Sequence, residues 1–435
     1  MILLAAWSVA VLPAQGQEAP PTAAPLETEA VTGPVNYDRA VRLALRRSPY
    51  FTKSSLEIEI KRLDETDSKF DLIPPITFRT QYYVSRPSGT TNRPYSLSFT
   101  SNNYNPFESY FTLQAKKVFT QISILAHMQV ITEGIQKLGR MFMEMDALKQ
   151  AAASQEDLVD LAQKNLDYFQ NRVRIGVGTS LEVRVAAQEL EGAKAERERI
   201  ASSRKRLQER IKVFIGMKPE QTLDLDCKEA RRQVMGGFDP AAATLEQARS
   251  HSYEIKMAEL KKELQKYNIL FAKAKLLPSL FGGATTPDPL NTIESRDMFV
   301  YIGLDVPVWE GFKRLRNISR QKTIMRQYDV ESDMKTNDLA GKWFDAQENL
   351  RAADVARKTA LAQEELARLK ERQGEIRYRS GGEPLVVFLE GRKGLVEAQR
   401  NAFLKTLDYD LAVLGLRHLS GDLGARYVDA NSWQQ

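Results

Sequence analysis

The side chains that most often carry chemistry are few in this chain and far apart. It holds three histidines, His127, His251 and His418, and a single cysteine, Cys227. The histidines lack metal-ligand spacing, and one cysteine excludes a disulfide framework and a zinc ribbon. There is no phosphate-binding glycine loop and no Ser/His/Asp grouping. The sequence therefore predicts no enzyme, no metal and no cofactor, and the histidines are expected to be packed or surface residues.

Charge is spread along the chain. The 435 residues include 62 Lys and Arg against 56 Asp and Glu, a formal net charge of +6. Dispersed charge of this kind is typical of solvated helix faces, so no nucleic-acid partner is predicted. Beyond the N-terminus, no stretch approaches the roughly 20 apolar residues of a membrane-spanning helix.

The first residues resemble an export signal. An apolar run from Ile2 to Leu12 is followed by Pro13-Ala14-Gln15-Gly16, a small-x-small pattern that suits signal peptidase. We predict a signal peptide over 1–16 and a flexible lead-in over 17–36, with a buried N-terminal helix as the alternative. No basic residue precedes the run, which leaves open whether Met1 is the natural start. No cysteine follows it to carry a lipid anchor.

The remainder of the chain is a duplication with an offset of 204 residues. Lys69 is matched by Lys273, and Leu72-Ile73-Pro74 is matched by Leu276-Leu277-Pro278. Looser matches at the same offset are Ala44–Pro49 with Ala248–Tyr253, and Gly178, Leu181 and Val183 with Gly382, Leu385 and Val387. We expect a first repeat over 37–222, an equatorial connector over 223–243, a second repeat over 244–423 and a tail over 424–435.

Each repeat is predicted to contain a helix, two strands, a very long helix, a glycine turn and another long helix. The first helix is expected over about 37–71, because Pro74 prevents its continuation. Alternation of apolar and polar residues predicts strands at 76–85, 95–100 and 298–306, with a short glycine-rich partner at 279–285.

The second repeat has a helix much longer than a globular core needs. From Gly311 to Tyr378 no proline interrupts the chain, and about 68 helical residues make a rod of about 100 Å. Within it Leu339, Trp343 and Ala346 step by four and three, the spacing of a coiled-coil seam. So few strands cannot close a sheet within one chain. Either the hairpins pack on the helices of a soluble α+β protein, or strands from several chains combine into a barrel.

Several motifs, in order and mostly present twice, indicate a known architecture. The Leu72–Pro74 and Leu276–Pro278 sites are similar to a helix-to-strand junction, and Val306–Gly311 to a strand exit. The segments Arg172–Val183 and Arg377–Val387 are similar to helix-turn-helix tips, and Ile211–Gly216 to the end of a first repeat. From about Tyr37 to Leu423 the chain thus resembles the outer membrane efflux protein family, the TolC-like outer-membrane factors. One departure is Asn105-Pro106-Phe107-Glu108, which lacks the glycine pair expected before the first long helix.

The resemblance implies a mainly α protein with a small β part. Duplicated long helical hairpins from three chains would form a trimeric α-barrel, continued by a 12-stranded transmembrane β-barrel with four strands per chain. Such a homotrimer lies in the outer membrane lipid with its helical part in the periplasm. It passively conducts cargo from a periplasmic adapter protein and an inner-membrane RND or ABC-type pump, in tripartite efflux or type I secretion. The alternative function is a periplasmic or surface coiled-coil scaffold without a pore.

The resemblance also implies roles for the two tips, at the periplasmic end. The tip glycines are expected to adopt positive φ; a plain turn without recognition is the alternative. The predicted adapter-docking residues are Gly176, Gly178, Thr179, Ser180, Leu181, Gly381, Gly382, Glu383, Pro384 and Leu385.

An aperture is expected at the same end. Three copies of Glu182 would form an acidic ring, latched by Arg174, Arg377 or Arg379, with Tyr378 as a gating aromatic; an ordinary solvated glutamate is the alternative. The second tip has Val386 where the family often has an acid. On the strands, lipid contact is expected for Met298, Val300, Ile302, Leu304 and Val306, while Arg79 and Asp305 would face the lumen.

Overall fold

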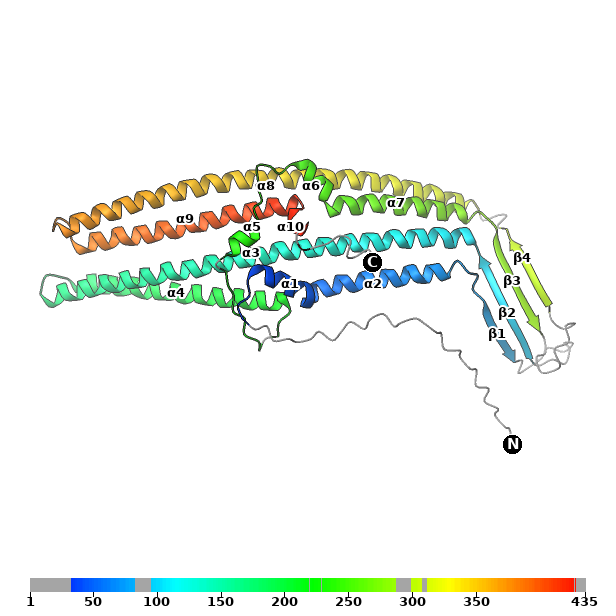
Figure 1. Ribbon diagram of the computed structural model, residues 1–435, viewed down its shortest axis with the longest axis horizontal. Helices are drawn as coiled ribbons and strands as arrows, with labels where there is room; N and C mark the ends of the chain where they lie inside the picture. The colour runs from blue at the N-terminus through cyan, green and yellow to red at the C-terminus, as the bar shows by residue number, and fades with distance from the viewer. Residues whose placement is uncertain are drawn as a thin grey trace, which may run out of the picture.

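The computed structural model describes residues 33–82, 95–218, 220–227, 229–286, 299–306, 311–425 and 427. The predicted signal peptide, most of the lead-in and most of the tail lie outside these residues. The described chain is mainly α with a four-stranded sheet, as predicted (Figure 1). Its elements are α1 (Tyr37–Arg47), α2 (Pro49–Phe70), β1 (Thr77–Tyr82), β2 (Tyr95–Tyr104), α3 (Pro106–Arg174), α4 (Ser180–Ile215), α5 (Ala230–Met235), α6 (Leu245–His251), α7 (Tyr253–Ala274), β3 (Ser279–Thr286), β4 (Phe299–Asp305), α8 (Lys313–Arg379), α9 (Leu385–Leu419) and α10 (Asp422–Ala425).

The duplicated hairpins are confirmed by the element boundaries. Helices α2 and α7 both have 22 residues, and they begin and end 204 positions apart. The long helices α3 and α8 have 69 and 67 residues, which corresponds to about 100 Å each. Each is followed by a tight tip and a shorter return helix, α4 or α9 (Figure 1).

The single first helix predicted over 37–71 is wrong, because two helices occupy this range. Ser48 has φ −69° and ψ 123° and separates α1 from α2, which starts with Pro49. A residue before proline is disfavoured in the helical region, so the sequence carried this signal. The break also makes room for Gly216, where an added Cβ would lie 2.3 Å from the Arg47 carbonyl oxygen.

The first long helix has a well-capped N-terminus although the glycine pair is missing from the sequence. The Asn105 side chain accepts hydrogen bonds from the amides of Phe107 and Glu108 at 3.0 and 3.3 Å, and Pro106 occupies the first helical position. Asparagine at the cap followed by proline is a favourable helix start. The Asn105 amide group also donates to the Ala274 carbonyl at 2.9 Å, which joins the first repeat to the second.

The helices form a layer with two edges. Toward the sheet the packing order is α2, α3, α7 and α8, and toward the tips it is α4, α3, α9 and α8 (Figure 1). Central α3 has 21 buried residues, whereas edge helix α8 has four. The largest core cluster lies at mid-length, where Tyr37, Phe142 and Leu414 are buried together with Cys227.

The sheet lies at the end of the molecule opposite the tips (Figure 1). Its order is β1-β2-β3-β4 with antiparallel pairing throughout. Strand β2 runs to Tyr104, beyond the predicted 95–100, past a register shift between Ser101 and Tyr104. Because β1 and β4 are terminal in this order, each has an edge without a partner strand among the described residues.

Candidate functional site: helical tips and sheet

The sheet has one apolar and one polar face. The register places Phe78, Phe99, Ala284 and Val300 side by side in one row. Because side chains alternate along a strand, the same face carries Leu97, Leu280, Ile302 and Leu304. The opposite face carries Thr77, Arg79, Ser98, Thr100, Ser279, Phe281, Thr285, Tyr301 and Asp305. The first face also carries Thr80 and Ser101, and the second carries two aromatic rings, so the sheet is amphipathic with one mainly apolar and one mainly polar face.

The predicted lipid-contact residues fall together on the apolar face. Val300, Ile302 and Leu304 are 69%, 86% and 62% exposed. Val306 follows the end of β4 and is exposed, and Met298 lies outside the described residues. Arg79 and Asp305 share the polar face, as expected from alternation. Other residues on the apolar face, such as Phe78 and Phe99, come from the first repeat and were not among the predicted lipid-contact residues.

The first tip reverses the chain through two glycines used in different ways. Gly176 has φ +79°, and the amides of Val177 and Gly178 donate to the Arg172 carbonyl at 2.9 and 3.1 Å. Gly178 has no positive φ; a Cβ there would lie 3.0 Å from Arg172 Cβ and from the Val173 nitrogen. The expectation of positive φ is confirmed for Gly176 and wrong for Gly178, where an added Cβ would be in tight contact with Arg172 and Val173.

The second tip repeats the plan with looser packing. Gly381 has φ +75°, and the Gly382 amide donates to the Arg377 carbonyl at 2.9 Å. A Cβ on Gly382 would lie 3.6 Å from that oxygen, an ordinary contact, so positive φ was wrongly expected there too. Pro384 occupies the N-cap of α9, and the Arg377 guanidinium lies 3.5 Å from the Glu383 carboxylate.

Glu182 is tied into the start of α4. The Thr179 amide and hydroxyl donate to its carboxylate at 2.8 and 3.1 Å, while the Glu182 amide donates to the Thr179 hydroxyl at 3.3 Å. This is a capping box, readable from Thr-x-x-Glu. Arg172 lies 3.5 Å away. The Thr179 backbone amide, its hydroxyl and the Arg172 guanidinium hold the pKa of Glu182 below its usual range.

Within this chain, the cation beside Glu182 is therefore not one of the three arginines that the sequence predicted. Arg172 takes the place of Arg174, while Arg377 pairs with Glu383 and Arg379 with Glu375. Tyr378 stacks on Phe388 with ring centroids 5.4 Å apart and planes 9° from parallel. Arg174 and Leu181 are exposed, as are Ile175 and Val177, two apolar tip residues that the sequence analysis did not select.

Two ion pairs connect the hairpins above the tips. Arg400 of α9 lies 3.2 Å from Glu196 of α4, and Lys393 lies 4.0 Å from Glu189. Both pairs join positions 204 residues apart, so each links equivalent residues of the two repeats. Opposite charge at the repeat offset is a signal that sequence analysis could have used. Hydrogen bonds from Arg199 and Arg400 lower the pKa of Glu196 to about 2.

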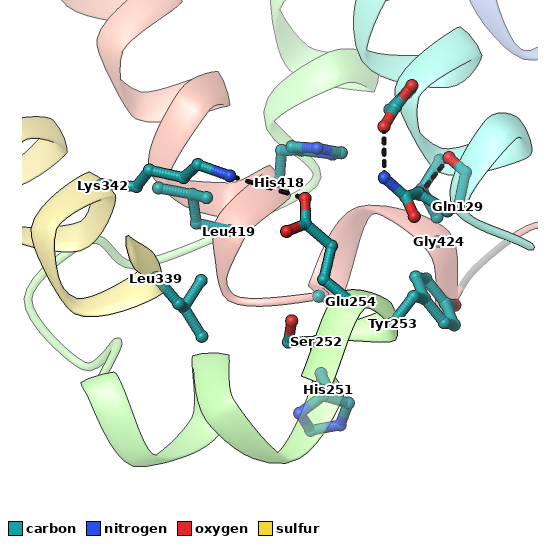
Figure 2. A pocket seen from close by; sticks show the side chains of 13 residues that line it. Gln129, His251, Ser252, Tyr253, Glu254, Leu339, Lys342, His418, Leu419 and Gly424 are labelled. Carbon is teal, nitrogen blue, oxygen red and sulfur yellow. Dashed lines mark hydrogen bonds and ion pairs between the residues drawn. The ribbon is translucent and has the colours of Figure 1, made fainter. Parts of the chain in front are cut away.

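A pocket lies at mid-length between α3, α6, α7, α8 and α9. Figure 2 shows Lys342 reaching toward Glu254, with His418 beside this pair. Glu254 also pairs with Lys335 at 3.3 Å, and burial lowers the pKa of His418. The ion pairs of Glu254 with Lys335 and Lys342 join α7 to α8, two helices of the second repeat.

Among the described residues, no group of three or more His, Cys, Asp or Glu side chains is placed to hold a metal ion. No helix in this part of the chain combines the length and the hydropathy needed to cross a membrane.

Comparison with known proteins shows which solved structures share this architecture. No protein-family model and no curated protein sequence matches the chain. Solved structures do match. The outer membrane channel CmeC of Campylobacter jejuni superposes with a TM-score of 0.74 at 14% identity, covering 92% of this chain and 88% of its own. The chain has the outer-membrane channel fold.

Two further structures give the same result. The outer membrane protein VceC of Vibrio cholerae has a TM-score of 0.72 at 13% identity, over 88% of this chain and 96% of that one. The MtrE outer membrane channel of Neisseria gonorrhoeae, in its open state, has 0.69 at 16% identity over 88% of each chain. The outer-membrane channel fold thus accounts for both repeats, the sheet and the tips together.

Proposed function

We propose that this protein is the outer-membrane duct of a tripartite efflux or type I secretion system. Cargo would pass through it without a catalytic step, driven by an inner-membrane RND or ABC-type pump and delivered through a periplasmic adapter. The fold it shares with outer-membrane channels supports this proposal. The observation that carries it is the sheet, which is mainly apolar on one face, mainly polar on the other and, among the described residues, open at both edges.

An amphipathic sheet of this kind suits a membrane only when its two edges are joined to other strands in a closed barrel. Lipid offers no hydrogen-bonding partners, so the free edges of β1 and β4 need other strands. Three copies with four strands each would supply a 12-stranded barrel. Ile302 and its row would then face lipid, and Arg79 and Asp305 would face water in the lumen. The long helices would continue the tube into the periplasm.

The tips are proposed as the adapter-docking and aperture region. Ile175, Val177 and Leu181 are 70%, 65% and 67% exposed at the end of the first hairpin. Exposed apolar groups on a rigid, hydrogen-bonded turn suit a protein partner. In a trimer, three copies of Glu182 would place an acidic ring at this end, with Arg172 as the neighbouring cation and Arg174, Tyr378 and Arg379 as further candidates.

Purification from outer membranes in detergent tests the duct. The duct predicts a trimer by native mass and, in negative stain, a tube well over about 100 Å long that is lost without detergent. A monodisperse soluble monomer or dimeric rod would contradict the duct and favour the coiled-coil scaffold. That alternative finds no support among the matching solved structures described above.

A further inference from the structure

The second repeat carries unbalanced positive charge where its two helices meet the sheet (Figure 1). The end of α7 with its C-cap, 264–275, has no acidic residue and three basic ones: Lys266, Lys273 and Lys275. The start of α8, 313–328, also has no acidic residue and six basic ones: Lys313, Arg314, Arg316, Arg320, Lys322 and Arg326. These nine residues, the basic band, carry more positive charge than the formal net charge of the whole chain, +6.

Neither the repeat nor helix stability accounts for the basic band. The equivalent stretches of the first repeat, 60–71 and 109–124, are nearly balanced, with five basic and four acidic residues. A helix N-terminus favours acidic side chains, because the backbone dipole is positive there. Helix α8 has no acidic residue in its first turn and begins with Lys313, Arg314 and Arg316. The band thus opposes the local preference of the helix, which points to a function for the charge.

Contacts between α7 and α8 identify the two faces of the helical layer here. Gln265 of α7 is buried and donates a hydrogen bond to the Gln321 side chain of α8 at 2.8 Å, which marks the middle of the contact. Two ion pairs flank it: Lys262 with Asp329 at 3.4 Å, and Lys261 with Glu331 at 3.1 Å. Because Lys261 and Lys262 are consecutive, they point about 100° apart, one to each side of Gln265. One ion pair therefore marks the Asp329 face and the other marks the Glu331 face.

Helical spacing places exposed cations of the band on both faces. Residues close to whole turns apart share a side of a helix. The Asp329 face therefore carries four exposed cations: Lys266, Lys273, Lys322 and Arg326. The Glu331 face carries three: Lys275, Lys313 and Arg320. Helix α7 packs between α3 and α8, so its exposed cations project from the layer. None of these seven cations forms an ion pair with another described residue.

We propose that the basic band lines the lumen directly below the barrel and favours anionic cargo, meaning molecules with carboxylate, sulfonate or phosphate groups. This inference rests on the proposed duct, in which one face of the helical layer lines the lumen. Because both faces carry the band, either orientation places at least three cations per copy there. A passage lined with charge of one sign concentrates ions of the opposite sign and selects among them.

Lipid headgroups form too thin a layer to account for the whole band. The headgroup region adds about 5–8 Å on each side of the hydrocarbon core. Along α8, Arg320 lies about 10 Å and Arg326 about 20 Å from Lys313, at the rise of a helix. On α7, Lys266 lies about 14 Å from Lys275. Contact with headgroups would need only the cations nearest the strands.

Reversal potentials across a planar lipid bilayer, with a potassium chloride gradient, test the proposal. One variant neutralises the Asp329 face: Lys266→Gln, Lys273→Gln, Lys322→Gln and Arg326→Gln. Its matched control neutralises the Glu331 face: Lys275→Gln, Lys313→Gln and Arg320→Gln. Neutralising the lumenal face should lower the chloride-to-potassium permeability ratio by about twofold or more, and neutralising the other face should leave the ratio unchanged. The chloride preference of the native protein should weaken as salt is raised, because screening shortens the reach of the charges.

The outcomes distinguish the band from the duct. A lower ratio in one variant alone would support the band and identify its lumenal face. Conduction with an unchanged ratio in both variants, or with the same decrease in both, would overturn the band alone. An unchanged ratio together with less phosphatidylglycerol retained by the trimer would assign the cations to lipid. Oligomers without any current would contradict the duct and the band with it. The amount of heat-stable oligomer is the folding control for both variants.

Discussion

At the first tip, a single carboxylate contributes both a helix cap and a negative charge. The Glu182 side chain accepts two hydrogen bonds from Thr179 and lies 3.5 Å from Arg172. Truncating it to alanine therefore removes the cap together with the charge, and the effect on an aperture could not be assigned to either. A Glu182→Gln substitution separates the cap from the charge, because glutamine can also complete a capping box. Gln247 does so with Thr244 at the start of α6.

We predict that Glu182→Ala and Thr179→Ala both loosen the first turn of α4, the latter by about 1 kcal/mol, whereas Glu182→Gln leaves it intact. Hydrogen exchange at the amides of residues 180–183 measures this. Because the pKa of Glu182 is lowered in the fold, its charged hydrogen bonds are present at neutral pH and are lost as pH falls through that lowered value. Equal exchange in all three variants would contradict the cap.

The same tip distinguishes two glycines that look alike in sequence. Gly178→Ala places a Cβ 3.0 Å from the Val173 nitrogen and should destabilise the first tip by about 1 kcal/mol or more, since the backbone there cannot yield easily. Gly382→Ala meets only an ordinary contact at 3.6 Å and should be tolerated. Limited proteolysis at each tip compares them, and equal resistance of both variants would show that the first tip can adjust.

At the scale of elements, ion pairs between equivalent residues of the two repeats link α4 to α9. Arg199 of α4 and Arg400 of α9 lower the pKa of Glu196 to about 2, so the stabilisation from these two bridges is present above the ordinary glutamate range and disappears only as pH falls through about 2. We predict that the distance between spin labels on α4 and α9 stays constant from about pH 7 to about pH 4. The distribution of this distance should broaden in the Arg400→Gln variant at both pH values. Separation of the wild-type hairpins already at about pH 4 would contradict the bridge.

The sheet makes a prediction that depends on which face a residue occupies. Ile302→Arg places a charge on the apolar face and should cost about 2–4 kcal/mol if that face meets lipid near the midplane. Thr100→Arg, on the polar face in the adjacent row, should assemble almost normally. The amount of heat-stable oligomer in outer membranes measures both. Equal loss would show that the two faces have the same environment.

Elements followed from the sequence more reliably than contacts did. Alternation and missing prolines gave the strands and the long helices, because these patterns are local. The break at Ser48 was missed although Pro49 signalled it. The Arg172 partner of Glu182 and the bridge from Glu196 to Arg400 depend on how helices turn against one another. Such rotation is set by packing along the whole hairpin, so spacing alone could not predict it.

At the scale of the whole molecule, the chain is a layer with two open sides. The strand order leaves one edge of β1 and one edge of β4 without a partner strand among the described residues, and the helix order leaves α2 and α8 at the same two sides. The apolar residues exposed along these helices, such as Leu63 and Met334, have no partner layer within the described chain. The proposed closed arrangement of several copies would cover the strand edges and the helix edges together.

Conductance across a planar lipid bilayer tests the central claim most directly. The purified oligomer, added from detergent, should produce discrete current steps, because a closed barrel with a polar lumen carries ions. The Ile302→Arg protein, prepared in the same way, should give few or no insertions. Steps of uniform size from the native protein would support an outer-membrane duct. Oligomers that insert into lipid without any ion current would contradict it.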